Sequence, residues 1–250
     1  MARAALPRRL SWQAARVVEL IEETPWTRSI VLEPPEWPGH RAGQHVDVRL
    51  TAEDGYQAER SYSIASAPED EQLVLTVERL DDGEVSPYLA DELRPGDELE
   101  LRGPIGGYFV WEERLGGPLL LLAGGSGVVP LRSMLRHRAA AGGTIPVRLL
   151  YSSKSLAEVI YRDELASLAA DDEEVDVRFT LTREQPEGWQ GYRRRIDEEL
   201  LREVAWPPDE RPLVYVCGPT AFVEVAATVL VQLGHEAGRI KTERFGPTGR

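Results

Sequence analysis

An uninterrupted apolar stretch at residues 119–123, Leu-Leu-Leu-Leu-Ala, runs directly into the glycine-rich sequence Gly124-Gly125-Ser126-Gly127. A strand that is apolar at every position is buried on both faces, as in a parallel sheet covered by helices. The elements expected after it alternate between strand and helix, which is typical of a doubly wound parallel sheet. The predicted strands are 147–151, 175–181 and 213–217, and the predicted helices are 131–141, 159–169, 196–204 and 221–233.

The residues before this stretch follow a different pattern. Residues 46–50, 73–77 and 99–101 alternate apolar and polar side chains, and turn sequences such as Asp82-Gly83 separate them. Several short strands at this spacing predict an antiparallel β-barrel or sandwich. One helix is expected at 87–93, with Ser86 as its N-cap and Pro87 in its first turn. We therefore predict a barrel domain at 1–113 and an α/β domain at 117–250.

Composition argues against several kinds of partner and site. The net charge of −13 disfavours nucleic acid and anionic membranes, because both require a basic surface. The single cysteine, Cys217, excludes an intrachain disulfide and a four-thiolate iron–sulfur centre. The four histidines lack ligand spacing, so no metal site is expected. Residues 1–9 lead into no apolar segment and glycines break the longest apolar run, so we expect a cytoplasmic chain without signal peptide or membrane insertion.

The segment Arg60-Ser61-Tyr62-Ser63 combines a cation, an aromatic ring and a hydroxyl on one expected strand. Arg60 and Tyr62 are two residues apart and therefore point to the same face of that strand. Arginine binds phosphate in a bidentate manner, and tyrosine offers a flat surface to a ring. This set suits a flavin, whose phosphates need cations and whose ring needs an apolar wall and a hydrogen bond. The four-residue pattern alone also occurs in ordinary strands.

Two glycine-containing segments follow this strand. Gly83-Glu84-Val85-Ser86 opens the helix expected at 87–93, and a helix N-terminus offers free N–H groups to phosphate. The alternative for Ser86 is a plain helix cap. Gly103-Pro104-Ile105-Gly106-Gly107 permits close backbone approach to a ligand. Phe109 and Trp111, directly after it, are interpreted as core residues, and contact with the ligand is the alternative.

A second ligand is indicated by Gly125-Ser126-Gly127-Val128-Val129-Pro130, which has the spacing of a dinucleotide fingerprint with Pro130 in place of the third glycine. Proline suits the first turn of a helix, whose N-terminus favours a pyrophosphate. An NAD site usually has an acidic residue after the second strand. Here Ser153 and Lys154 stand there, and a hydroxyl and an ammonium favour the 2′-phosphate of NADPH. The alternative is a solvated basic loop.

The last predicted strand ends in Cys217-Gly218-Pro219. The carboxyl ends of strands in a doubly wound sheet are where such folds bind ligands, so this turn is a candidate site. The alternative for Cys217 is a small buried apolar residue, which is the commoner case for a lone cysteine.

In their order and spacing, the RxYS, GxxS, GPxG, GxGxxP and CGP segments resemble the ferredoxin–NADP reductase family over nearly the whole chain. The resemblance implies that Arg60 holds a flavin phosphate, that Tyr62 stacks on the isoalloxazine and that Ser63 lies near the flavin N5. It implies further cofactor contacts at Ile64, Gly83, Ser86, Gly125, Gly127, Val128, Pro130, Ser153, Lys154, Arg183, Arg195, Cys217, Gly218, Pro219 and Phe245. Among these, Arg183 and Arg195 stand where NADP-using members of the family place their cations.

The resemblance also implies catalytic roles for Ser63, Cys217 and Glu243, with Cys217 beside the nicotinamide C4. Lys241-Thr242-Glu243-Arg244-Phe245 is similar to the end of bacterial members, where an acidic residue and an aromatic residue shield the flavin–nicotinamide contact. Plant-type members end in tyrosine, whereas this chain continues to Arg250. The roles of Glu243 and Phe245 therefore remain open at this point.

The function implied by the resemblance is that of an FAD-dependent oxidoreductase. It takes hydride from NADPH, or NADH, and passes electrons to a separate carrier such as ferredoxin or a partner redox enzyme. One alternative is a free-flavin or quinone reductase, and another is a non-catalytic flavin-bearing subunit of a larger complex. FMN in place of FAD also stays open.

Overall fold

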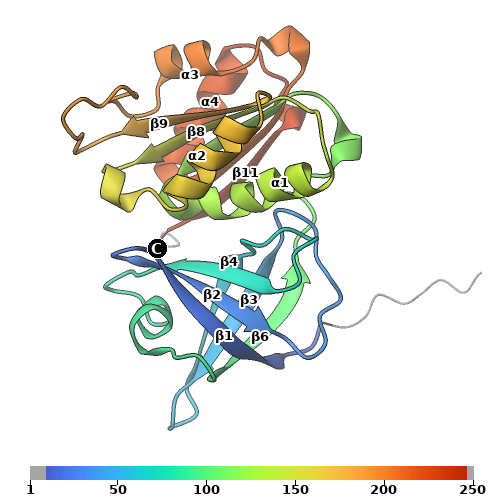
Figure 1. Ribbon diagram of the computed structural model, residues 1–250, viewed down its shortest axis with the longest axis vertical. Helices are drawn as coiled ribbons and strands as arrows, with labels where there is room; N and C mark the ends of the chain where they lie inside the picture. Colours follow the sequence, from blue (N-terminus) through green and yellow to red (C-terminus); the bar gives the residue numbers. More distant parts are fainter. Residues whose placement is uncertain (1–9, 247–250) are drawn as a thin grey trace, which may run out of the picture.

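The computed structural model describes residues 10–246 and shows two sheets, one above the other (Figure 1). The N-terminal half forms a six-stranded antiparallel sheet, and the C-terminal half forms a five-stranded parallel sheet with helices. The predicted fold class, an antiparallel barrel followed by a doubly wound parallel sheet, is confirmed. The prediction that residues 1–9 are no signal peptide lies outside the described residues.

The antiparallel sheet has the strand order β4-β3-β6-β1-β2-β5 and curls until its two edges meet. A bridge between Ile64 and Leu75 joins the edges, and the N–H of Ala65 donates to the carbonyl of Val74 at 2.8 Å. The barrel interior is filled by the alternate apolar residues of its strands, such as Val46 and Val48. The strands are β1 (Gln13–Thr24), β2 (Thr27–Glu33), β3 (His45–Thr51), β4 (Gln57–Ser63), β5 (Leu73–Glu78) and β6 (Glu98–Ile105).

Strands β1 and β2 were not predicted from the sequence. Strand β1 is twelve residues long, but among its buried positions only Ala15 and Val17 are apolar residues of the barrel core. Its exposed and intermediate positions mix apolar residues with Gln13, Arg16 and three glutamates. The apolar alternation that reveals a strand is therefore weak, although the strand pairs with both β2 and β6.

The helix predicted at 87–93 is a five-residue π-helical turn, Tyr88–Glu92, and Ser86 does not cap it. The Ser86 hydroxyl oxygen instead accepts the N–H of Leu80 at 3.1 Å. Gly83 leaves room for that hydroxyl, because a Cβ at Gly83 would lie 2.6 Å from Ser86 Oγ. The predicted N-cap is therefore wrong, since the Ser86 side chain closes the preceding loop rather than the helix.

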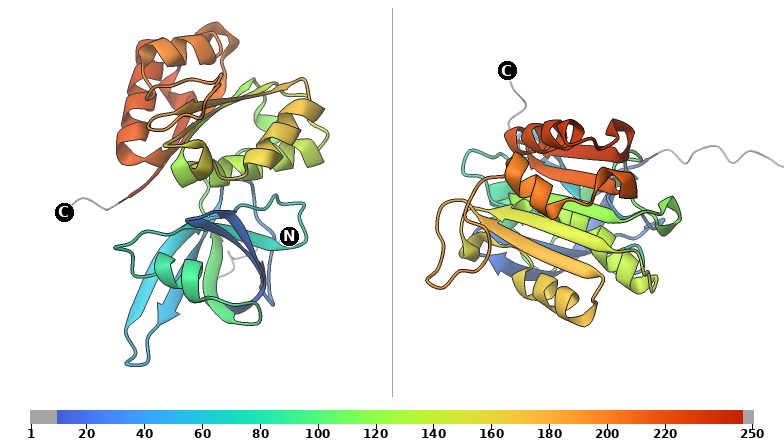
Figure 2. Two further views of the ribbon diagram at one scale, coloured as in Figure 1. Left: turned by 60° about the vertical axis from the view of Figure 1, so that its left-hand side comes forward. Right: turned by 90° about the horizontal axis from the view of Figure 1, so that it is seen from above.

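The parallel sheet has the order β11-β10-β7-β8-β9 and is covered by helices on both faces (Figure 2). Leu119 and Leu121 of its central strand pack against one cluster of buried residues with helices α1 and α2. Leu120 and Leu122 pack on the opposite face with α3 and α4. The elements are β7 (Leu119–Gly124), α1 (Val128–Ala140), β8 (Val147–Ser153), α2 (Arg162–Asp171), β9 (Val175–Leu181), α3 (Glu198–Val204), β10 (Leu213–Pro219), α4 (Thr220–Gln232) and β11 (Ile240–Phe245).

Local signals in the sequence explain where several of these elements begin. Pro130 lies in the first turn of α1, as predicted. Helix α3 starts after Asp197, whose carboxylate accepts the N–H of Leu200 at 2.9 Å. None of the helices formed by residues 10–246 combines the length and the apolar character needed to cross a membrane.

The apolar run at 119–123 makes a prediction about stability. Leu121 is fully buried in the central strand, so Leu121→Ala should lower the free energy of unfolding by about 2–5 kcal/mol. Leu115→Ala is the control, because Leu115 is 41% exposed and should change that energy by less than about 0.5 kcal/mol. Urea denaturation of the two variants measures both values. Equal losses would contradict the buried position of β7.

Candidate functional site

Helix α1 holds the loop that follows strand β4. The Ser133 hydroxyl donates to the carbonyl of Ser66 at 2.7 Å, and Nη1 of Arg132 donates to the carbonyl of Ala65 at 3.1 Å. Arg136 contacts both carboxylate oxygens of Asp70, at 2.8 and 3.1 Å. Since α1 begins at the glycine-rich turn and the loop begins at the RSYS segment, these contacts position the two predicted ligand-binding segments relative to each other.

A second set of buried contacts joins the two sheets. The Tyr215 hydroxyl of β10 donates to the carbonyl of Val110 at 2.7 Å, and its ring meets Phe109 edge-on at 5.3 Å. The Tyr161 hydroxyl donates to Thr76 of β5. Phe109 is buried in the same cluster as α1, which agrees with its interpretation as a core residue. The junction between the sheets is therefore packed and hydrogen-bonded.

The two glycine turns of the parallel sheet pack directly on each other. A Cβ at Gly127 would lie 2.1 Å from the carbonyl oxygen of Cys217, and a Cβ at Gly218 would lie 3.1 Å from the Cα of Gly124. A Cβ at Gly125, whose φ is +54°, would lie 3.9 Å from the Glu78 carboxylate of barrel strand β5. The absence of side chains thus lets the two turns approach each other closely, and it leaves Gly125 on the side of the turns that faces the barrel.

Four residues link the barrel to the carboxyl ends of β10 and β11, partly through strand pairing and partly through side-chain contact. Ser63 pairs with His45 across strands β4 and β3, and Nδ1 of His45 lies 3.9 Å from Oε1 of Glu243. Glu243 pairs with Cys217 across strands β11 and β10. The three residues predicted as catalytic are therefore brought to one junction. His45 was not identified from the sequence, because only strand pairing places it opposite Ser63.

Burial dominates the electrostatics of this junction. It raises the pKa of Glu243 to about 7, and Glu243 Oε2 is buried without a hydrogen-bond partner among residues 10–246. Burial and the nearby charge of Glu243 raise the pKa of the Cys217 thiol well above its usual value. Burial also lowers the pKa of His45. Cys217 is consequently a thiol, not a thiolate nucleophile, in the neutral pH range.

The RSYS segment meets the GEVS segment on the barrel surface. Nη2 of Arg60 lies 2.5 Å from Oε2 of Glu84, and both side chains are half exposed. Tyr62 packs against the barrel core, and burial raises its pKa to about 12. The Ile64 side chain is fully buried in the same core, so only its backbone is available to a ligand. Gly83 and Ser86 lie on either side of Glu84, so the ion pair between Arg60 and Glu84 brings Arg60 close to both of them.

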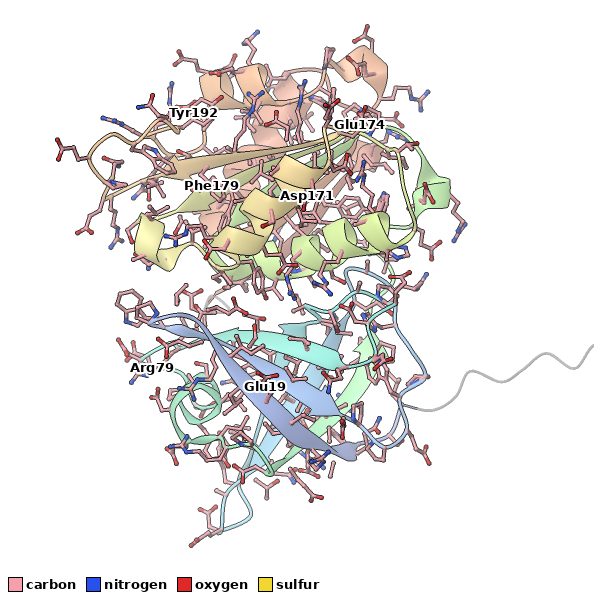
Figure 3. All side chains as sticks on the ribbon, in the orientation of Figure 1. Glu19, Arg79, Asp171, Glu174, Phe179 and Tyr192 are labelled. Atoms are coloured by element: carbon pink, nitrogen blue, oxygen red, sulfur yellow. The ribbon has the colours of Figure 1, made fainter. Side chains whose placement is uncertain are left out.

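The predicted 2′-phosphate residues lie at the carboxyl ends of β8 and β9. The carbonyl of Lys154 accepts the N–H of Arg183 at 2.9 Å, while Nζ of Lys154 lies 3.1 Å from Glu158. Arg183 and Arg195 are exposed, and within residues 10–246 neither has an ion-pair partner. Arg195 comes near β9 because residue 192 donates its N–H to the carbonyl of residue 179 at 3.0 Å (Figure 3).

Among the other predicted contacts, Ser153 has a buried side chain and Pro219 is exposed at the end of β10. Phe245 is 37% exposed and pairs with Pro219 in the register of β11. Strand β11 itself was not predicted, although its residues were identified as a motif. Only its pairing with β10 brings Glu243 and Phe245 to the edge that holds Cys217. No group of three histidine, cysteine, aspartate or glutamate side chains in residues 10–246 is arranged to hold a metal ion.

Comparison with known proteins agrees with this geometry. Residues 29–110 match the oxidoreductase FAD-binding domain, and residues 121–228 match the oxidoreductase NAD-binding domain. The chain is 34% identical over 238 residues to ferredoxin–NADP reductase B of Sorangium cellulosum, a match that covers 92% of this chain and 96% of that protein. The chain belongs to the ferredoxin–NADP reductase family. It is an NAD(P)H-dependent flavoprotein oxidoreductase that binds FAD, as predicted.

The chain is also similar to a solved domain structure and to a longer reductase subunit. The FAD/NAD-binding domain of nitric oxide dioxygenase from Vibrio cholerae has a TM-score of 0.84 and 27% identity, covering 94% of this chain and 99% of that one. The glycine betaine monooxygenase reductase subunit of Pseudomonas aeruginosa is 31% identical over 240 residues, which are 93% of this chain and 64% of that subunit. The chain thus spans just under two thirds of that reductase subunit.

The raised pKa of Glu243 predicts a pH dependence of stability. Glu243 takes up a proton more readily in the folded protein than in the unfolded chain, so its contribution is present below about pH 4.5 and is lost as pH rises to about 7. Relative to Glu243→Gln, the wild-type free energy of unfolding should fall by roughly 2–3 kcal/mol between pH 4.5 and 7.5. Urea denaturation at matched flavin content measures this difference.

The control for this experiment is Glu210→Gln, at an exposed position away from the junction. The difference in free energy of unfolding between the wild type and Glu210→Gln should stay nearly constant over the same pH range. If the difference in free energy of unfolding between the wild type and Glu243→Gln were also independent of pH, the Glu243 carboxylate would be solvated in the folded protein.

Proposed function

We propose that this chain is an NADPH-preferring reductase that passes electrons one at a time to a separate protein. The observation that carries the proposal is the junction at which Ser63 and His45 of the barrel meet Cys217 and Glu243 of the parallel sheet. The proposed domain bounds remain 1–113 and 117–250, with the junction between them.

The residues at the junction suit a flavin on the barrel side. Arg60 offers an exposed cation, Tyr62 an aromatic ring and Ser63 a hydroxyl on one strand. The turn at Gly125 has open space around it, because a Cβ there would meet only the Glu78 carboxylate at 3.9 Å, while Gly218 packs closely on Gly124 behind it. When bound, the nicotinamide supplies a hydride, and the flavin accepts it and returns electrons singly.

The protein side of this chemistry is orientation and the holding of a proton. We propose that the Ser63 hydroxyl donates a hydrogen bond toward the flavin edge and that Cys217 packs against the nicotinamide. The Glu243 carboxyl, with a pKa of about 7, can hold a proton at physiological pH and release it. Phe245 and Pro219 would exclude water from the contact, because they lie paired at the outer end of the same edge.

A preference for NADPH is supported by three cations at the ends of β8 and β9. Lys154 and Arg183 lie next to each other through a backbone hydrogen bond, and Arg195 lies on the segment that runs beside β9. The acceptor is proposed to be a separate ferredoxin or partner oxygenase component, in line with the names of the relatives. The single thiol of Cys217 supports a separate carrier, since an iron–sulfur cluster needs more ligands. We place the chain in the cytoplasm.

The function is tested on purified protein. The protein should be yellow, release FAD on denaturation, lose its flavin absorbance with NADPH and reduce ferricyanide. A screen of carrier proteins against free flavin and quinones then separates an electron-transfer reductase from a free-flavin or quinone reductase. Bound flavin that NADPH and NADH both fail to reduce would instead indicate a non-catalytic subunit.

The proposed cations at the ends of β8 and β9 predict a preference for NADPH over NADH. The double variant Lys154→Ala, Arg183→Ala should raise KM for NADPH by at least ~10-fold and leave KM for NADH nearly unchanged, because each charge-assisted contact is worth about 1.5–3 kcal/mol. Arg202→Ala, on the exposed side of α3, is the control. Steady-state kinetics with both nucleotides measure the effect. Equal kcat/KM for NADPH and NADH in the wild type would refute the preference.

The proposed positions of Ser63 and Cys217 predict the effect of their replacement on the rate of hydride transfer. Cys217→Ser and Ser63→Ala should each slow flavin reduction by at least ~10-fold, about 1.4 kcal/mol of barrier, with little change in FAD content. Ser61→Ala is the matched control, because Ser61 lies on the same strand with its hydroxyl bound to Asp47. Stopped-flow absorbance with NADPH measures the rate. Wild-type rates in both variants would assign Ser63 and Cys217 to packing only.

A further inference from the structure

The carboxylate of Glu84 forms an ion pair with Arg60, the residue that is proposed to bind the flavin phosphate. Oε2 of Glu84 lies 2.5 Å from Nη2 of Arg60, and Oε1 accepts the Tyr56 hydroxyl at 3.0 Å. Nη1 of the same arginine donates to the carbonyl of Glu59 at 2.7 Å, so its own strand holds the guanidinium in place. A phosphate that reaches Arg60 therefore meets Glu84 as a competitor for the same donor.

The backbone that carries Glu84 is anchored on both sides. The N–H of Gly83 donates to the carbonyl of Leu80 at 2.9 Å, and the Ser86 hydroxyl accepts the N–H of Leu80 at 3.1 Å. Arg79, at the start of the loop, donates from its Nε to Asp91 of the helical turn at 2.7 Å. Glu84 therefore stays close to any phosphate on Arg60, and only its side-chain torsions can redirect its charge.

A carboxylate at this position acts differently on the two common flavin cofactors. FMN ends in a phosphomonoester, which carries about −1.5 to −2 charge near pH 7. Each phosphate of the FAD pyrophosphate carries a single charge, and the chain continues into adenosine. The ribose of that adenosine offers hydroxyl donors, and acidic side chains accept such hydroxyls in dinucleotide sites. Glu84 thus repels FMN, whereas FAD can supply new partners for the displaced carboxylate.

The surface around Glu84 suits the adenosine half. Tyr56 and Leu80 lie on the two segments that the Arg60–Glu84 pair joins, and they are 58% and 56% exposed. An exposed aromatic ring beside a carboxylate matches a purine attached to a ribose, since the ring stacks and the carboxylate accepts hydroxyls. FMN has no group that reaches this surface.

We propose that Glu84 selects FAD over FMN. Its carboxylate repels the terminal phosphate of FMN at Arg60, whereas the pyrophosphate of FAD can bind there because the attached ribose offers Glu84 new hydroxyl partners. This inference rests on the proposed flavin site at Arg60 and adds a residue that determines which flavin occupies it. The selectivity comes from one side chain, because the Arg60 cation can bind the phosphate of either cofactor.

The test is flavin binding by the full chain after its flavin has been removed. FAD and FMN are titrated separately into the wild type and Glu84→Gln at pH 8, with isothermal calorimetry as the readout. The wild type should bind FAD at least 10-fold more tightly than FMN. Glu84→Gln should bind FMN at least 10-fold more tightly than the wild type does, while its affinity for FAD stays within threefold or falls. The ratio of the two affinities should therefore drop by at least 10-fold.

Glu92→Gln is the matched control, because Glu92 is an exposed acid of the neighbouring helical turn and its loss changes the net charge equally. It should leave the FAD-to-FMN ratio unchanged. An unchanged ratio in Glu84→Gln, or an equal change in Glu92→Gln, would overturn the role of Glu84 alone. A wild type that binds neither flavin would instead overturn the proposed site, so the two failures are distinguishable.

Discussion

The hydrogen bonds between helix α1 and the loop after strand β4 hold the barrel and the parallel sheet in one arrangement. Ser133 is fully buried and donates to the carbonyl of Ser66, and Arg136 holds Asp70 through two contacts. Buried hydrogen bonds of this kind are costly to leave unmade, so the junction resists sliding. Because Ser63 and Gly127 stand at the near ends of these same two segments, their relative position follows from the helix rather than from a ligand.

The buried junction and the exposed surface around Arg60 differ in how they treat charge. At the junction, burial favours the neutral forms of Glu243, Cys217 and His45. At the surface, the Arg60 cation is half exposed and paired, and exposed pairs are weak enough for a ligand to displace. In the proposed function, solvated cations would bind the anionic parts of the cofactors, and the reacting rings would lie at the junction, where burial disfavours charged side chains.

Several local features could be predicted from the sequence because they depend on neighbouring residues only. The apolar run at 119–123 is buried on both faces, and Pro130 lies in the first turn of α1. The prediction for Ser86 failed because its hydroxyl has two possible partners nearby, the helix and the Leu80 N–H, and the loop geometry favours the second. Strand β11 was overlooked because a six-residue edge strand with polar positions has little periodicity, even though its motif was noticed.

The sequence by itself determined the two kinds of sheet, their order in the chain and the chemical groups available to a flavin and a dinucleotide, since periodicity and motif spacing are properties of adjacent residues. Only the tertiary structure decided which of these groups meet. His45 gained its place opposite Ser63, and its approach to Glu243, from strand pairing between distant segments. Glu84 became the partner of Arg60 because the barrel closes between β4 and β5, which brings the loop after β5 beside β4. Contacts between residues far apart in the chain, and the burial that shifts the Glu243 pKa, arise only when both sheets are packed together.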